Sequence, residues 1–277
     1  MNTGIRGRRR TAAVIATAGA LAFSVLNAPA AQAADTGIVV SDLVINDYKP
    51  IVVGTSKVVE PPVSLFMTLP AGYSTDDSSS WDVSPFLYRG GLTNHGYNYI
   101  GLDSLTCYEH SSQSARCEGN LRIDPGPTRY DADSNSDATK WKIGVHLMLF
   151  KANGHLQAEE YESRPGTLSL RRATKLTVAD ATPEPVAQGK KVTVVGKLTR
   201  ANWTTKKNDP YGGSRVSLQF RARNASAFRT VKKVTTNSAG VLRTTVTAST
   251  DGFYRWVYSG NTVTGTATSG QDFVDVR

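Results

Sequence analysis

The stretch RVSLQFRAR, residues 215–223, alternates apolar and polar side chains. Successive side chains of a β-strand point to opposite faces, so Val216, Leu218 and Phe220 share one face and the arginines share the other. Arginine is rarely buried without a partner. The pattern therefore predicts a strand with one face in a hydrophobic core and the other in solvent.

Six further segments around this stretch are rich in β-branched and aromatic residues. They are TKLTVA (174–179), KVTVVGKLT (191–199), RTVKKVTT (229–236), VLRTTVTA (241–248), FYRWVYS (253–259) and DFVDV (272–276). Turn signals such as Gly212-Gly213 and Asp251-Gly252 separate them. About seven strands in about 100 residues is typical of an immunoglobulin-like sandwich. No comparable segment has the apolar period of a helix.

The segment TDGFYRW, residues 250–256, allows two interpretations, because Tyr254, Trp256 and Tyr258 share one strand face. An Asp-Gly-x-Tyr entry is how a tyrosine corner begins, and Trp256 would then lie where antibody domains carry their second cysteine. We expect this core arrangement. The alternative is an aromatic shelf on which a sugar stacks.

The segments RRATKLTV, PVAQGKKVTVVGKLTRANW and GGSRVSLQFRARNASAFRTVKKVTT resemble the C-terminal module of secreted proteins of Gram-positive actinobacteria. The resemblance spans about residues 171–277, and SDLVINDYKPIVVGTSK and DATKWKIGV extend it more loosely into the first half. It implies secretion and a C-terminal immunoglobulin-like β-sandwich. Such proteins generally have no assigned activity, so the resemblance implies no catalytic residue. Some of them carry a calcium-binding label.

The first half of the chain is also β-rich, and it differs from the second half in charge. Its candidate strands are GIVVSDLVI (37–45), PVSLFMTL (62–69), SLTCYEH (104–110) and KWKIGVHLMLF (140–150). Residues 35–171 hold 11 Lys and Arg against 17 Asp and Glu, whereas residues 172–277 hold 17 against 6. We therefore expect an all-β protein with an acidic, long-looped sandwich at 35–165 and a basic immunoglobulin-like sandwich at 172–277. The Pro-Gly turn of ESRPGTLSLRR, residues 162–172, would join them.

The N-terminus indicates export. RGRRR (6–10), the apolar run at 11–26 and AQA (31–33) form the three parts of a signal peptide, which we expect to be cleaved after residue 33. Whether export is general or twin-arginine stays open. No later segment reaches about 18 uninterrupted apolar residues, so we expect no transmembrane segment in the exported chain.

The two cysteines, Cys107 and Cys117, would meet an oxidising compartment after export. We expect a disulfide between them. The alternative is a reactive thiol, or a metal pair with the nearby His110.

Residues 130–141, YDADSNSDATKW, resemble a calcium loop in part. Asp131, Asp133, Asn135 and Asp137 place oxygen-bearing side chains at every second position. An EF-hand loop needs Gly at its sixth position and Glu at its twelfth, and here Ser136 and Lys142 occupy those positions. The EF-hand is therefore excluded. A looser calcium site on these residues and a polar turn both remain as hypotheses.

Residues 81–101 form an aromatic, glycine-containing segment with Trp81, Tyr88, His95, Tyr97 and Tyr99. Aromatic side chains on turn-rich backbone often build glycan- or protein-binding sites. The alternative is that these aromatics tuck under the edge of the sandwich.

The chain lacks a G-x-S-x-G elbow, an H-E-x-x-H pair and a phosphate-binding glycine loop, so we expect no enzyme.

The basic second half predicts binding of an anionic cell-surface polymer such as teichoic acid. Its candidate residues are Arg215, Arg221, Arg223, Lys232, Lys233 and Arg243. We expect no specific nucleic acid, a secreted protein, and a non-covalent association with the wall, because no sorting motif follows the last strand. The alternatives are a calcium-binding extracellular protein and a glycan- or protein-binding aromatic segment. A further protein partner is not indicated.

Overall fold

The computed structural model describes residues 35–93, 98–126 and 132–277. Within these ranges the chain forms strands, loops and two 3-10 turns, η1 (Asn46–Tyr48) and η2 (Asn135–Asp137), and no α-helix. The expected all-β fold is confirmed. The predicted signal peptide, residues 1–33, lies outside the described residues. Among the residues described, no helix is long and apolar enough to cross a membrane.

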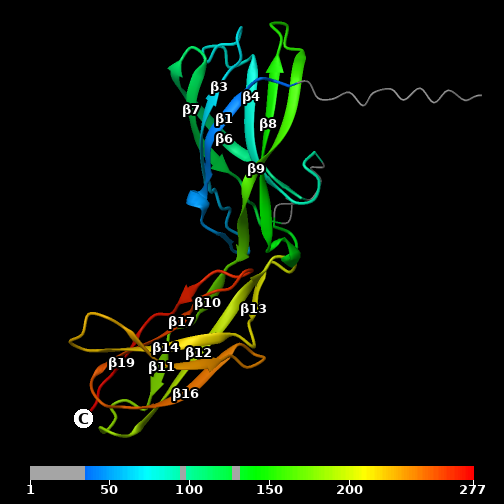
Figure 1. The fold of residues 1–277 in the computed structure, drawn as a ribbon. Coiled ribbons are helices and arrows are strands. Elements are labelled where there is room, and N and C mark those ends of the chain that lie inside the picture. Colours follow the sequence, from blue (N-terminus) through cyan, green and yellow to red (C-terminus); the bar gives the residue numbers. More distant parts are fainter. Residues whose placement is uncertain (1–34, 94–97, 127–131) are drawn as a thin grey trace, which may run out of the picture. The chain divides into compact units, whose positions relative to one another are not determined.

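The strands of the first half form two sheets (Figure 1). One sheet has the order β1 (Val39–Ile45), β3 (Pro62–Thr68), β7 (Ser114–Leu121) and β6 (Leu102–Ser111). The other has the order β2 (Ile51–Val53), β9 (Leu156–Arg172), β8 (Lys140–Phe150), β4 (Trp81–Tyr88) and β5 (Tyr99–Ile100). β2 runs parallel to β9, and the other neighbours are antiparallel.

This strand order is that of an immunoglobulin-like sandwich. If the strands are lettered along the chain, the first sheet reads A-B-E-D and the second reads G-F-C-C′, with β2 as an added edge. Apolar side chains of both sheets meet between them, as sheet-on-sheet packing requires. Trp141, Phe86 and Leu147 are among the largest fully buried side chains of this half.

Several predictions for the first half need correction. The four predicted strands are present, but Trp81–Tyr88 is the strand β4 and not a loop. Its sequence hid the strand because Val83, Phe86, Leu87 and Tyr88 are all buried, so apolar and polar residues do not alternate.

The expected linker is also different. β9 continues through the Pro-Gly pair to Arg172, and the register shift between Lys142–Thr167 and Ile143–Arg164 leaves Pro165 and Gly166 as a bulge. The division of the chain at 165 and 172 stays a prediction.

The second half forms a sandwich of two further sheets. In one, the long strand β12 (Lys191–Asn202) pairs with β10 (Thr174–Leu176), β11 (Asp180–Thr182), β13 (Lys207–Pro210) and β16 (Val241–Thr247). The other has the order β15 (Arg229–Thr235), β14 (Arg215–Ala222) and β17 (Gly252–Tyr258), with β18 (Ala267–Thr268) and β19 (Asp272–Val274) both on β17. Lettered along the chain, the sheets read A-B-E and C′-C-F-G, which is again an immunoglobulin-like order.

The centre of the second sandwich is the ring of Trp256 on β17, which is fully buried. It lies against Gly196 on β12, in the opposite sheet, and its Nε1 donates a hydrogen bond to Val195 O at 3.1 Å. Tyr254 and Tyr258 are buried on the same strand face. The predicted burial of the three aromatic side chains is therefore confirmed, and the sugar-stacking shelf is wrong. The hydrogen bond of a tyrosine corner is not formed, because no described residue bonds to the Tyr254 hydroxyl.

Gly196→Ala should destabilise the protein, because a Cβ at this position would lie 2.7 Å from both Cδ1 and Nε1 of Trp256. Overpacking of this kind costs about 1–3 kcal/mol. This exceeds the stabilisation of about 0.4–1 kcal/mol that Gly→Ala gives by lowering the conformational entropy of the unfolded chain. Urea unfolding, monitored by tryptophan fluorescence, measures the change in the free energy of unfolding. Gly54→Ala is the matched control, because a Cβ there would have no neighbour within 4 Å. Equal stability of the two variants would contradict the central role of this contact.

Candidate functional site

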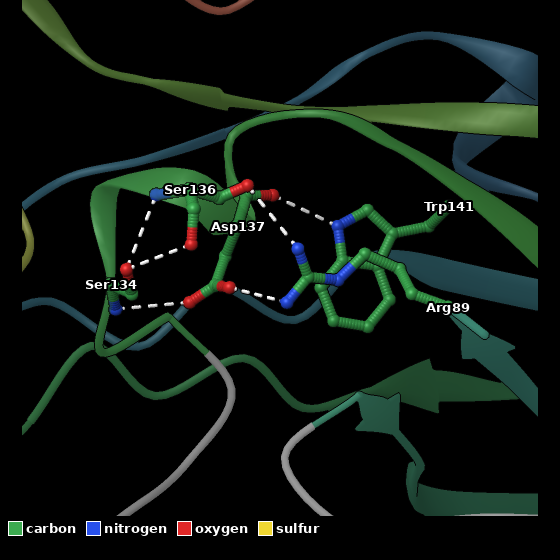
Figure 2. A network of polar contacts seen from close by, with 5 residues as sticks. All are labelled: Arg89, Ser134, Ser136, Asp137 and Trp141. Atoms are coloured by element: carbon green, nitrogen blue, oxygen red, sulfur yellow. Dashed lines mark hydrogen bonds and ion pairs between the residues drawn. The ribbon is translucent and has the colours of Figure 1, made fainter.

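The segment that resembles a calcium loop is a capped 3-10 turn that leads into β8 (Figure 2). Ser134 precedes η2, and its hydroxyl accepts a hydrogen bond from Ser136 N at 3.3 Å. Asp137 reaches back and accepts from Ser134 N at 2.9 Å. The two bonds form a capping box, which satisfies backbone donors that the short turn leaves free.

The second oxygen of Asp137 is held by Arg89, which follows β4 (Figure 2). The Arg89 Nη2 to Asp137 Oδ1 distance is 2.5 Å, and Arg89 also donates to Ser136 O at 3.2 Å. The guanidinium lies 4.7 Å from the centre of the Trp141 ring, whose Nε1 donates to Asp137 O at 2.9 Å. The network therefore ties the loop to β4 and β8.

The described members of the predicted calcium site do not gather around one point. Asn135 donates to Asn202 Oδ1 at 2.9 Å and accepts from Trp203 N at 3.0 Å, so its amide is engaged with the second half. Asp133 lies beside Asp137, and Asp131 lies outside the described residues. No three His, Cys, Asp or Glu side chains in the described ranges are arranged to hold a metal ion. Calcium binding stays a prediction.

Burial raises the pKa of Asp137, and Asp133 raises it further, against the lowering effects of the Ser134 N–H and Arg89. An acid whose pKa is raised by folding contributes stability at low pH that is lost as the pH rises. Of the two groups that lower the pKa of Asp137 and so limit this loss of stability, Arg89 is the cation.

The predicted aromatic segment is divided between two environments. Trp81 donates a hydrogen bond to Ser74 O at 3.1 Å, whereas Tyr88 and Tyr99 pack against Phe86 with ring centres 5.6 and 5.0 Å away. His95 and Tyr97 lie outside the described residues. The described rings therefore lie on the sheet β4–β8–β9 and do not stand on an open loop.

Three residues of this aromatic group were not predicted. Phe86 covers Gly144 closely, and Tyr161 of β9 stacks on His146 of β8 with ring centres 4.1 Å apart. His146 Nε2 also lies 2.8 Å from Glu159 Oε1. Gly144, inside an otherwise large-residue strand, was the available signal, because such a glycine often marks a close approach.

The predicted disulfide is present. Cys107 on β6 and Cys117 on β7 are direct cross-strand partners with Cα atoms 4.0 Å apart, and their sulfurs are bonded. It lies within one sheet, whereas the disulfide of antibody domains joins the two sheets.

The outer face of the sheet β14–β17–β19, together with the loop that follows β14, carries arginines interleaved with phenylalanine rings. We call this surface the Arg–Phe face; its members are Arg221, Arg223, Arg255, Phe228, Phe253 and Phe273. Arg255 lies 3.8 Å from the Phe228 ring centre, and Arg221 lies 4.4 Å from that of Phe253. Arg223 lies 5.9 Å from the Phe273 ring centre. Each guanidinium thus lies within cation–π distance of a phenylalanine ring, Arg223 at the far end of that range.

The six predicted polymer-binding residues do not share one surface. Arg215 and Lys233 lie at outward positions of the same sheet as Arg221 and Arg223, since Lys233 pairs with Ser217. Lys232 pairs with inward-facing Leu218 and donates to Thr245 O at 3.2 Å, at the open edge of the sandwich. Arg243 pairs with Val195 and lies on the outer face of the opposite sheet.

Arg255 and the three phenylalanines of the Arg–Phe face were missed by the sequence analysis. The available signal was the alternation of Arg255 with the inward side chains of Tyr254 and Trp256. That alternation places Phe253 and Arg255 on one outward face, next to Arg221 of the paired strand.

No family model and no curated protein matches the sequence. Solved structures with some likeness include the D0–D1 domain of intimin, at 12% identity over 85% of this chain and 98% of that one, with a TM-score of 0.25. The ectodomain of mouse nectin-like molecule 4 has 11% identity over 86% and 63%, with a TM-score of 0.24. The major pilin subunit of Bacillus cereus has 10% identity over 80% and 59%, with a TM-score of 0.22. Such scores carry no argument, so the fold assignment rests on strand pairing.

Arg89→Met should lower the free energy of unfolding by about 2–4 kcal/mol at neutral pH, because it leaves the buried Asp137 carboxylate without its cation. Without Arg89 the pKa of Asp137 rises further, so the loss should shrink as the pH falls and Asp137 takes up a proton. Urea unfolding at several pH values measures both effects.

Arg116→Met is the matched control for this experiment, because Arg116 pairs with Glu118 on an exposed strand face. Its effect should stay below about 1 kcal/mol. A cost of Arg89→Met that grows as the pH falls would contradict the role given to Asp137.

Proposed function

We propose that the protein is an extracellular, non-catalytic binding protein that holds an anionic polymer of the cell surface on the Arg–Phe face of its second sandwich. The observation that carries the proposal is the stacking of Arg221 and Arg255 on phenylalanine rings at an outward sheet face. The net charge of residues 172–277, 17 Lys and Arg against 6 Asp and Glu, supports it.

The geometry of these arginines favours a ligand over mere solubility. Arg221 donates to Ala225 O at 3.0 Å and Arg255 donates to Gln219 Oε1 at 2.9 Å, so both side chains are oriented before any ligand arrives. Each guanidinium has five N–H donors, and these contacts use one of them. Orienting a long side chain beforehand lowers the entropy that binding must supply.

The shape of the ligand follows from the arrangement of charge. The Arg–Phe face spreads its cations along a sheet surface, and an extended ligand can contact several of them at once. Guanidinium groups match phosphate oxygens with two parallel hydrogen bonds. Phosphate-bearing wall polymers such as teichoic acids fit this chemistry best, and attraction to them should weaken as salt rises.

Replacing Arg221 and Arg255 together by Glu should release the protein from purified Gram-positive cell walls and reduce its affinity for teichoic acid by at least about tenfold. The same pair changed to Lys should retain charge but lose the planar stack, and should bind with intermediate affinity. Co-sedimentation with walls at increasing salt measures retention.

Arg243→Glu is the control, since Arg243 lies on the opposite sheet and its reversal changes the net charge half as much as reversal of the pair. It should keep most of the retention. If the Glu pair is retained like the unmodified protein, or if walls stripped of anionic polymer retain the protein equally well, the proposed function is wrong.

A further inference from the structure

A groove opens at the edge of the second sandwich where β15 and β16 leave the two sheets unjoined. These strands follow one another along the chain but belong to different sheets. The groove has a volume of 390 Å³, and Phe220 and Tyr254 of the core are among its lining residues. It lies on the inward side of β14 and β17, whereas Arg221 and Phe253 of the Arg–Phe face are outward.

The charge in this groove has one sign. Lys191, Arg229 and Lys232 line it, and none of its lining residues is acidic. Lys191 Nζ donates to Thr247 Oγ1 at 2.8 Å, and Lys232 Nζ donates to Thr245 O at 3.2 Å. Both ammonium groups are thus held at the groove, and each has further N–H donors to offer.

Tyr254 supplies a second, independent observation. Its side chain is buried, with 5% of its surface exposed. In a tyrosine corner the hydroxyl bonds to nearby backbone. Here no residue of the described ranges forms a hydrogen bond with the Tyr254 hydroxyl, although the residue lines the groove. Burial raises the pKa of Tyr254, so the hydroxyl keeps its proton at neutral pH and can donate it.

We propose that this groove binds the tetrahedral oxyanion of a phosphate or sulfate ester, with Lys191, Arg229, Lys232 and the Tyr254 hydroxyl as donors. A tetrahedral oxyanion offers oxygens in several directions and can accept from donors that surround it. A planar carboxylate has only two oxygens in one plane. The Tyr254 hydroxyl lines the groove without a hydrogen-bond partner among the described residues, and an oxyanion bound there can accept from it.

Protection of a sheet edge explains only part of this arrangement. Lysine on an edge strand discourages pairing with another chain, and the bond from Lys232 to Thr245 O fits that role. Edge protection requires neither Arg229 at the same groove nor an unpaired tyrosine hydroxyl. The site also stands apart from the proposed polymer-binding surface, so each can fail without the other.

Two-dimensional ¹H–¹⁵N NMR of the purified protein tests the proposal, with sodium phosphate, sodium sulfate and sodium acetate titrated at constant ionic strength. We expect saturable shifts at Lys232, Thr245 and Thr247 with phosphate or sulfate and weaker, non-saturating shifts with acetate. The tighter of the two oxyanions assigns the ester. Acetate binding as tight as that of both oxyanions, or shifts spread over all basic residues, would overturn the proposal.

Two variants test the donors. Arg229→Gln should weaken oxyanion binding by about tenfold or more, as loss of a charge-assisted hydrogen bond does. Tyr254→Phe keeps the buried ring and removes only the hydroxyl, so it should weaken binding by roughly fivefold while the spectrum stays that of a folded protein.

Two controls separate this site from its surroundings. Arg243→Gln should bind oxyanion like the unmodified protein, since Arg243 lies on the outer face of the opposite sheet. When Arg221 and Arg255 are replaced by Glu, the saturable shifts at Lys232, Thr245 and Thr247 should persist, whereas any phosphate contact on the Arg–Phe face should be lost. Unchanged affinity in both Arg229→Gln and Tyr254→Phe would show that the groove is not the site.

Discussion

The contact of the Trp256 ring with Gly196 fixes the arrangement of the second sandwich. It joins β17 to β12 at the point where antibody domains join their sheets by a disulfide, and it leaves no room for a Cβ on the facing strand. Because strand side chains alternate, an inward Trp256 forces Phe253 and Arg255 outward. The pairing of Phe253 with Arg221 on β14 then assembles the Arg–Phe face. The position of the Arg–Phe face is thus a consequence of core packing.

Alternation in the sequence was sufficient to predict the longer strands of the second half and the burial of Tyr254, Trp256 and Tyr258, because both depend on residues close in the chain. The short strands β11, β13 and β18 were not predicted. It could not predict which strands become neighbours. Arg243 and Arg221 are both outward by the same count, yet they lie on opposite sheets, since β16 pairs with β12 and β14 pairs with β17. Lys232 differs again, because it pairs with inward-facing Leu218 and so lies on the inward side of β15, at the open edge of the sandwich.

The segment at 131–137 shows the same limit in a more local form. Asx residues at alternating positions suit a calcium loop and a capped turn equally, because both use side-chain oxygens as acceptors. The partners distinguish the two cases, and they come from distant parts of the chain. Asp137 pairs with Arg89, 48 residues earlier, and Asn135 bonds to Asn202, 67 residues later. Spacing within the loop contains no information about either partner.

Strand β14 separates two cationic surfaces of different character. Its outward side chains contribute to a solvated face, where charges are screened by salt and a ligand gains from many weak contacts. Its inward Phe220 borders the groove that we propose binds one small anion through oriented ammonium groups and the Tyr254 hydroxyl. One strand can therefore contribute to a contact with a long polymer on one face and border a contact with a single charged group on the other, since its side chains alternate between the two faces.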